Sequence, residues 1–238
     1  MRIGESRIFL VSQKWRDRQA GRRDLAVDRK SEIAENLAKV RQSIPAEVNL
    51  IVVTKTFPAS YVEILKQLGV NDFGENKDQE GRAKSAIVPG KWHFQGQIQS
   101  NKLKSICNWA DTIHSIDEIR HVEMLKKFGK ALEVFIQVSL DGGENRGGCD
   151  PEQLNSIAEV VRDSNLELMG LMAVAPLNEP PEQAFARLSV IHKKFQEKYP
   201  DSPYLSAGMS HDYEVAIRHG ATHVRIGSKI LGSRTYPN

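Results

Sequence analysis

Lys55 stands at the end of a strongly apolar stretch, where its amine could do chemistry. Residues 50–53 are apolar without alternation, which is typical of a parallel strand covered on both faces. A lone lysine at such a strand end most often extends its amine into solvent. The alternative is that the amine has a carbonyl partner, and residues at other strand ends bear on that choice.

Two short segments near the C-terminal end combine small residues in a way that suits an anion. Residues 208–210 read Gly-Met-Ser before a short predicted helix, and residues 226–228 read Ile-Gly-Ser at the next strand end. Small residues let backbone N–H groups approach a phosphate. Each segment alone is consistent with a tight turn, but the two together favour a phosphate site.

Arg225 is unusual because it lies on an apolar strand. Alternation points its side chain to the side opposite Val224 and Ile226, toward the interior of a barrel. A guanidinium keeps its proton at any ordinary pH, so an inward arginine needs an acceptor. Two kinds of acceptor are possible for Arg225. One is a carboxylate in an internal ion pair, for example that of Glu75, and the other is an acceptor atom of a ligand.

The apolar pattern predicts the scaffold that positions these residues. Helical spacing predicts an extra N-terminal helix over Arg29–Ser43, and the clearest later helices are Ser60–Leu68, Glu118–Phe128, Pro151–Arg162 and Glu182–Lys198. The strand candidates are Asn49–Thr54, Asp72–Glu75, Lys91–Gly96, Thr112–Ser115, Glu133–Ser139, Glu167–Val174, Tyr204–Met209 and His223–Gly227.

Eight strands alternating with helices predict an α/β protein, a single (β/α)8 TIM barrel with an extra N-terminal helix. A doubly wound open sheet is the second possibility, which the absence of a GxGxxG motif after any strand disfavours. In a barrel, chemistry collects at the C-terminal ends of the strands, and a phosphate often binds after strands 7 and 8. The unusual residues of this chain lie at those predicted ends.

Composition narrows the class of protein. The 238 residues are 26% charged and 40% hydrophobic, as in a soluble globular protein, and no apolar run is long enough for a membrane span. Residues 1–28 hold seven basic and four acidic residues, which accounts for the whole net charge of +3. We expect a poorly ordered basic arm at 1–28 and a barrel over 29–238. Because the remainder is neutral, we expect no nucleic-acid partner.

The absence of an apolar signal region and the cysteine pattern favour the cytoplasm. Cys107 and Cys149 are far apart without CxxC spacing, so we expect reduced thiols and no metal ligands.

Taken in order, six motifs make the chain resemble a known family. They are VTKT, GENKDQE, WHFQGQIQSNK, GLMAVAP, LSAGMSHD and VRIGSKILG, and the match spans roughly residues 30–234. The chain resembles the pyridoxal phosphate homeostasis proteins, which are single-domain relatives of the alanine racemase N-terminal barrel. The departures from the usual pattern are Ala207, Gln95, Gln97 and Arg146.

The resemblance implies a set of cofactor-binding residues and no catalytic ones. Lys55 would form a Schiff base with pyridoxal 5'-phosphate, and Arg225 would face the pyridine nitrogen. Ser210, Gly227 and Ser228 would hold the phosphate with Ile226 beside it, and the ring pocket would be lined by Asn76, Met172 and Ser206. Relatives of this kind suggest a monomer, with pyridoxal phosphate-dependent apoenzymes as candidate recipients.

Three functions are compatible with these motifs. The first is a carrier for pyridoxal phosphate homeostasis without robust catalysis, and the second is a slow amino-acid racemase. A racemase needs a second acid–base group, which His93 or a partner chain would have to supply, since no room is left for the C-terminal β domain of racemases. The third is a barrel isomerase acting on phosphorylated sugars. The first is favoured.

Overall fold

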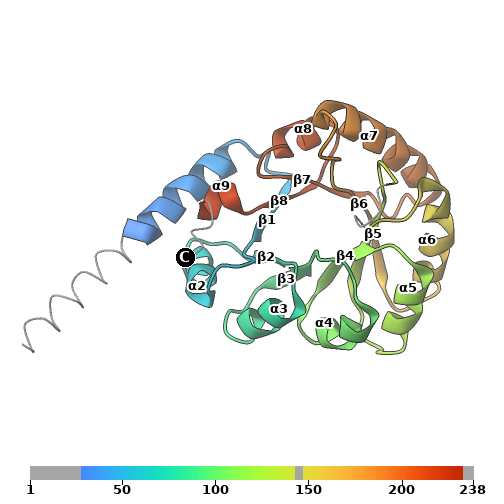
Figure 1. Cartoon of the computed structure of the whole chain (residues 1–238), viewed down its shortest axis with the longest axis horizontal. Coiled ribbons are helices and arrows are strands. Elements are labelled where there is room, and N and C mark those ends of the chain that lie inside the picture. The colour runs from blue at the N-terminus through green and yellow to red at the C-terminus, as the bar shows by residue number, and fades with distance from the viewer. Residues whose placement is uncertain (1–27, 143–146, 233–238) are drawn as a thin grey trace, which may run out of the picture.

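The computed structural model describes residues 28–142 and 147–232, and a closed barrel of eight parallel strands forms its centre (Figure 1). The strands follow one another around the barrel in sequence order, and β1 closes it by pairing with β8. This confirms the predicted TIM barrel, and each predicted strand end lies within two residues of the observed one. The strands are β1 Asn49–Val53, β2 Asp72–Glu75, β3 Lys91–Phe94, β4 Thr112–Ile116, β5 Glu133–Gln137, β6 Glu167–Met172, β7 Tyr204–Met209 and β8 His223–Ile226.

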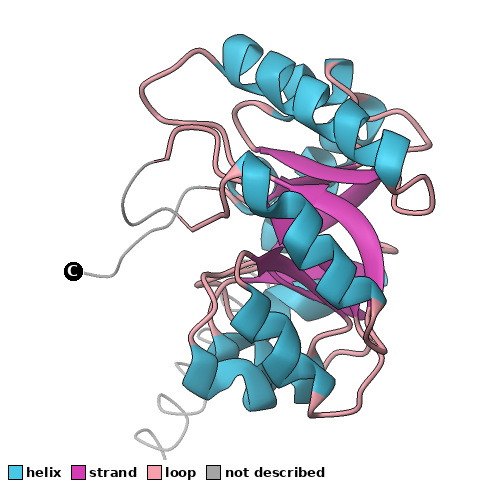
Figure 2. Ribbon diagram, turned by 90° about the vertical axis from the view of Figure 1, so that its right-hand side faces the viewer, coloured by secondary structure: helices cyan, strands magenta, loops and turns pink. Residues whose placement is uncertain are grey.

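The helices lie around the outside of the strands (Figure 2). Residues 28–42 are helical, as predicted, whereas residues 1–27 of the predicted arm lie outside the described part of the chain. The α-helices are α2 Ala59–Gln67, α3 Asp78–Ser85, α4 Leu103–Trp109, α5 Ile119–Lys126, α6 Leu154–Arg162, α7 Pro181–Lys198, α8 Tyr213–Arg218 and α9 Ser228–Leu231. Short 3-10 turns, η1 Ser100–Lys102 and η2 Pro151–Gln153, precede α4 and α6.

The main core fills the layer between the strands and the helices. Outward side chains of β2 and β3 meet α4 in an aromatic cluster, in which the rings of Phe73 and Trp92 lie 5.1 Å apart and those of Trp92 and Trp109 lie 6.4 Å apart. Helix α3 approaches this cluster closely at Gly81, where a Cβ would lie 2.3 Å from the Trp109 ring. Glycine at this position therefore sets how near α3 lies to the barrel.

The N-terminal helix packs beside α9, at the point where the last strand ends (Figure 1). Its buried side chains are Ile33, Leu37 and Val40, at the helical spacing seen in the sequence. The amide of Asn36 donates a 3.3 Å hydrogen bond to the carbonyl of Ile230. In residues 28–142 and 147–232, no helix combines the length and apolarity that crossing a membrane requires.

A chain of polar side chains occupies the barrel interior. Nε2 of His93 lies 3.0 Å from the Asp72 carboxylate, and Nδ1 of His93 lies 2.9 Å from Nε2 of His114. Nδ1 of His114 lies 2.9 Å from Oγ of Ser206, which also accepts a 2.8 Å hydrogen bond from Arg225. These contacts connect the start of β2 to the arginine near the end of β8.

The half-buried His223 makes the fold sensitive to acid. The pKa of His223 is lowered to about 4, mainly by burial and to a smaller extent by the charge of the nearby His93. Between about pH 6.5 and 4 the unfolded chain therefore binds a proton that the folded one does not, so stability falls as the pH falls through this window. We expect protonation of this histidine to lower the free energy of unfolding by roughly 3 kcal/mol between neutral pH and about pH 4, at 1.36 kcal/mol per pKa unit.

Urea unfolding at several pH values, compared between the native chain and His223→Asn, measures this contribution. The variant is expected to have a shallower dependence of unfolding free energy on pH. An identical dependence in both proteins would show that His223 is not an acid-sensitive group.

Candidate functional site

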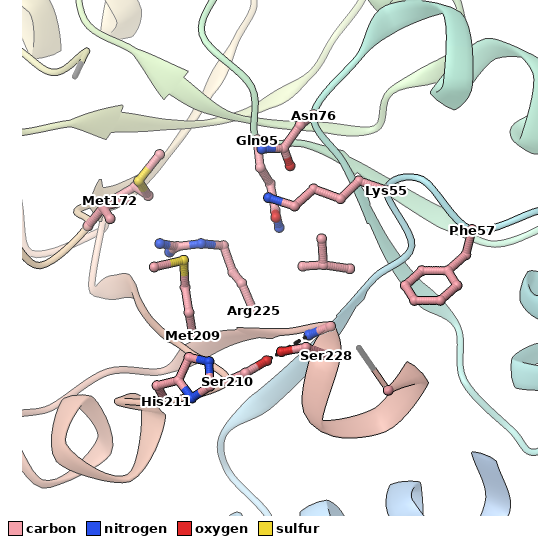
Figure 3. A pocket seen from close by; sticks show the side chains of 14 residues that line it. Lys55, Phe57, Asn76, Gln95, Met172, Met209, Ser210, His211, Arg225 and Ser228 are labelled. Atoms are coloured by element: carbon pink, nitrogen blue, oxygen red, sulfur yellow. Dashed lines mark hydrogen bonds between the residues drawn. The ribbon is translucent and has the colours of Figure 1, made fainter. Parts of the chain in front are cut away.

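A pocket of about 270 Å³ opens at the C-terminal ends of the barrel strands (Figure 3). Seven of the residues predicted from sequence line it, namely Lys55, Asn76, Met172, Ser210, Arg225, Gly227 and Ser228. Ser206 and Ile226 are not among the described lining residues, and both are fully buried. Ser206 lies behind the wall and contacts Arg225, so its place is beneath the pocket.

The backbone on both sides of Lys55 is anchored from outside the barrel. Thr54 faces away from the pocket, where its hydroxyl donates a 2.6 Å hydrogen bond to the Glu75 carboxylate. The carbonyl of Thr54 accepts a 2.8 Å hydrogen bond from Nζ of Lys84 in α3. Thr56 has a positive φ of 69°, and its N–H donates a 2.6 Å hydrogen bond to Glu80 of the same helix.

These anchors explain why Lys55 faces inward. Successive side chains of a strand alternate, so the outward direction of Thr54 turns the next side chain toward the barrel axis. The left-handed conformation of Thr56 turns the chain away immediately after Lys55, which lies two residues beyond the end of β1, and is uncommon for a β-branched residue. Helix α3 therefore fixes where the amine enters the pocket.

A buried ion pair between Glu75 and Lys84 is the centre of this anchor. Nζ of Lys84 lies 2.6 Å from Oε1 of Glu75, and the two side chains are 6% and 0% exposed. Burial raises the pKa of Glu75, and the charge of Lys84 acts in the opposite direction. The sequence-based alternative that paired Glu75 with Arg225 is wrong, because Glu75 faces α3 and Arg225 faces the barrel interior.

Arg225 presents a buried guanidinium at the base of the pocket. It donates a 2.8 Å hydrogen bond to Ser206 and a 3.0 Å hydrogen bond to the carbonyl of Ala173. Burial lowers its pKa to about 10, so the group remains charged near neutral pH. The side chain points inward, as strand alternation predicts, and is available to an acceptor in the pocket.

Backbone donors converge at the ends of β7 and β8. The N–H groups of Gly227 and Lys229 point at the hydroxyl oxygen of Ser210, at 3.2 and 3.4 Å. A Cβ at position 227 would lie 2.9 Å from the carbonyl of Val53, so only glycine lets β8 approach β1 this closely. The result is a cluster of N–H and hydroxyl groups of the kind that holds a phosphate.

Several other residues line the pocket and carry no role in the sequence-based assignment. They are Val53, Phe57, Gln95, Val174, Met209, His211 and Gly232. His93, which the racemase hypothesis needed as a base, is 1% exposed and is not among the described lining residues. Its ring nitrogens contact Asp72 and His114, toward the opposite end of the barrel.

Only one group of described residues could hold a metal ion, and it lies away from the pocket. It comprises Asp117, Glu118 and His121, near the start of α5. Glu118 is already paired with Arg120 at 2.6 Å, so a cation partner is present.

Family comparison places this barrel and pocket in a known group. The model of the alanine racemase N-terminal domain matches residues 29–235, and the chain belongs to that family. Within it, the chain belongs to the pyridoxal phosphate homeostasis proteins. The protein of that name from Mycobacterium leprae is 38% identical over 88% of this chain and 95% of its own length. The protein of the same name from Pseudomonas aeruginosa is 40% identical over 87% of this chain and 97% of its own length.

Solved structures agree with this assignment. The structure of PipY from Synechococcus elongatus without pyridoxal phosphate superposes on this chain at a TM-score of 0.79 and 33% identity, covering 84% of this chain and all of PipY. With pyridoxal phosphate bound, PipY superposes at 0.77 and 32% identity, with the same coverage. An alanine racemase of Clostridium difficile superposes at a TM-score of 0.73 and 14% identity, covering 87% of this chain and 58% of the racemase chain. At this identity the likeness is one of fold.

Proposed function

We propose that this protein binds pyridoxal 5'-phosphate as a Schiff base on Lys55 and takes part in pyridoxal phosphate homeostasis without robust catalysis. The observation that carries the proposal is the meeting of a lysine amine, a buried arginine and a cluster of backbone donors in one pocket. The names of its relatives and the pyridoxal phosphate bound to PipY support it.

The residues of the pocket fit the three functional groups of this cofactor. Bound pyridoxal phosphate supplies an aldehyde, with which an amine condenses and releases one water molecule. Lys55 provides the amine, which is the nucleophile in Schiff-base formation with a carbonyl group. The donors at Gly227, Ser228 and Ser210 suit a phosphate dianion, and the guanidinium suits an unprotonated pyridine nitrogen.

Arg225 also limits the reactions that the pocket supports. A guanidinium donates a hydrogen bond and cannot accept one, so it keeps the ring nitrogen unprotonated and makes the ring a weaker electron sink. The pocket wall, as far as it is described, offers His211 as a further proton-exchanging group. Figure 3 places His211 beyond Ser210, on the side away from the Lys55 amine.

A slow racemase is the second candidate function, and His211 is the observation that favours it. Turnover of an amino acid by pure protein that disappears in both Lys55→Ala and His211→Ala would establish this activity. The carrier function predicts no such turnover. It predicts instead that an added amine releases the cofactor from Lys55, so that an apoenzyme can take it up.

An absorbance titration tests the proposed function. Adding pyridoxal phosphate to the purified protein is expected to produce a visible band that borohydride removes while fixing the cofactor to the chain. A barrel isomerase for phosphorylated sugars would give neither the band nor the adduct. We further propose that the protein is cytoplasmic and monomeric. Light scattering of the protein loaded with pyridoxal phosphate would test the monomeric state.

Replacing Arg225 tests its place at the ring. Arg225→Glu is expected to raise the basicity of the ring nitrogen, because a carboxylate stabilises a protonated neighbour. The visible band should then shift with pH in the variant, whereas Arg225→Lys, which keeps a positive donor, should resemble the native chain. Identical spectra and affinity in Arg225→Glu and the native protein would place Arg225 away from the ring.

A further inference from the structure

Gln95 brings a buried amide to the pocket without satisfying it. The residue lines the pocket, and its Nε2 atom is buried with no hydrogen-bond partner among the described residues. Buried polar atoms in folded proteins nearly always have a partner. An unsatisfied donor at the wall of a ligand pocket therefore points to a ligand acceptor.

The position of this amide is fixed by its surroundings. The N–H of Gln95 donates a 2.8 Å hydrogen bond to the carbonyl of Glu75, which continues the pairing of β2 with β3 beyond the strand ends. A Cβ on Gly74 would lie 2.9 Å from Oε1 and 3.0 Å from Nε2 of Gln95. The amide thus lies in the space that glycine leaves open, and any side chain at position 74 would displace it.

The other anchors decide which part of the cofactor faces Gln95. In pyridoxal phosphate the aldehyde is opposite the ring nitrogen, with the phosphate arm on one side of the aldehyde and the ring hydroxyl on the other. Arg225 and Lys55 define the axis from nitrogen to aldehyde. Figure 3 shows Ser210 and Ser228 on one side of that axis and Asn76 on the other, and it draws the amide of Gln95 at the Lys55 end of the axis. The phosphate takes the first side, which leaves the hydroxyl on the second, next to the aldehyde and therefore at the end of the axis where Gln95 lies.

We propose that Nε2 of Gln95 donates a hydrogen bond to the ionised ring hydroxyl of pyridoxal phosphate and so selects ligands that carry this oxygen. The inference rests on the proposed function, because it uses the cofactor orientation that Lys55 and Arg225 define. A charged acceptor makes such a hydrogen bond stronger than a neutral one. Gln95 is then a specificity-determining residue of this chain.

Two ligands and two variants test this proposal. The ligands are pyridoxal phosphate and its 3-deoxy analogue, which lacks only the ring hydroxyl. The variants are Gln95→Leu and the matched control Gln97→Leu, since Gln97 is an exposed glutamine of the same segment that is not among the described lining residues. The quantity measured is the affinity for pyridoxal phosphate divided by the affinity for the 3-deoxy analogue. Comparing this ratio between a variant and the native protein cancels any effect of the missing hydroxyl on the reactivity of the ligand itself.

We expect Gln95→Leu to lower this ratio about tenfold relative to the native protein, whereas Gln97→Leu leaves it unchanged. Equal ratios in Gln95→Leu and the native protein, with both folded by thermal melting, would overturn the role of Gln95. Failure of the native protein to form a borohydride-fixed adduct with pyridoxal phosphate would overturn the proposed function itself. These two failures are therefore distinguishable.

Discussion

Lys55→Ala is expected to form no borohydride-fixed adduct and to bind pyridoxal phosphate at least about a hundredfold more weakly, a loss of about 2.7 kcal/mol. The variant keeps the arginine and the phosphate donors but has no amine for the aldehyde. Equilibrium titration followed by reduction measures both quantities. The fold should be unaffected, because the hydrogen bonds that anchor Thr54 and Thr56 do not involve the lysine side chain.

Lys102→Ala is the matched control, since Lys102 is exposed and is not among the described lining residues. It should bind and reduce like the native chain. A Lys55→Ala protein that still incorporates one equivalent of cofactor on reduction would contradict the assignment of Lys55.

Lys84→Ala is expected to lower the free energy of unfolding by about 3–5 kcal/mol, the usual result of removing one partner of a buried ion pair. It leaves the Glu75 carboxylate buried without its cation and removes the donor to the Thr54 carbonyl. Urea unfolding measures the loss. Because the same contacts hold the strand end, the affinity for pyridoxal phosphate should also fall.

Two further variants separate the ion pair from general effects of substitution. Lys84→Met combined with Glu75→Gln removes both charges, and we expect it to be more stable than Lys84→Ala. Arg120→Ala removes an exposed pair with Glu118 and should change stability by less than about 1 kcal/mol. A loss of similar size in Arg120→Ala and Lys84→Ala would contradict a special role for the buried pair.

The barrel was predictable because short strand-like stretches alternate with helical ones along the chain and the unusual residues follow the predicted strand ends. The apolar run at residues 50–53 is typical of a parallel strand covered on both faces by other elements. The same pattern identified the inward side of β8, and the structure places Arg225 there. Helix α3 escaped prediction because residues 78–85 are largely polar and contain a glycine, so no apolar stripe marks it.

Depth within the barrel could not be predicted from strand alternation. Alternation tells which side of a strand a residue faces, whereas its height along the axis depends on the stagger of neighbouring strands. The pairing of β7 with β8 shifts register between Ser206 and Met209. Ser206 consequently faces inward, as the resemblance implied, yet lies beneath Arg225 instead of lining the pocket.

The contacts of charged side chains were equally beyond the sequence. Glu75 had two cations available, and the outward direction of its side chain selects Lys84 over Arg225. Gln95 was visible only as a departure from the usual family pattern. Its amide is unsatisfied because the fold buries it against Gly74, a contact that no sequence pattern marks.

Peptide mapping after borohydride reduction of the protein loaded with pyridoxal phosphate tests the central claim most directly. A pyridoxyl group is expected on the peptide that contains Lys55, at one per chain. The same group on Lys229, beside the donor cluster, or on another lysine would contradict the account, as would a fully loaded protein that yields no modified peptide.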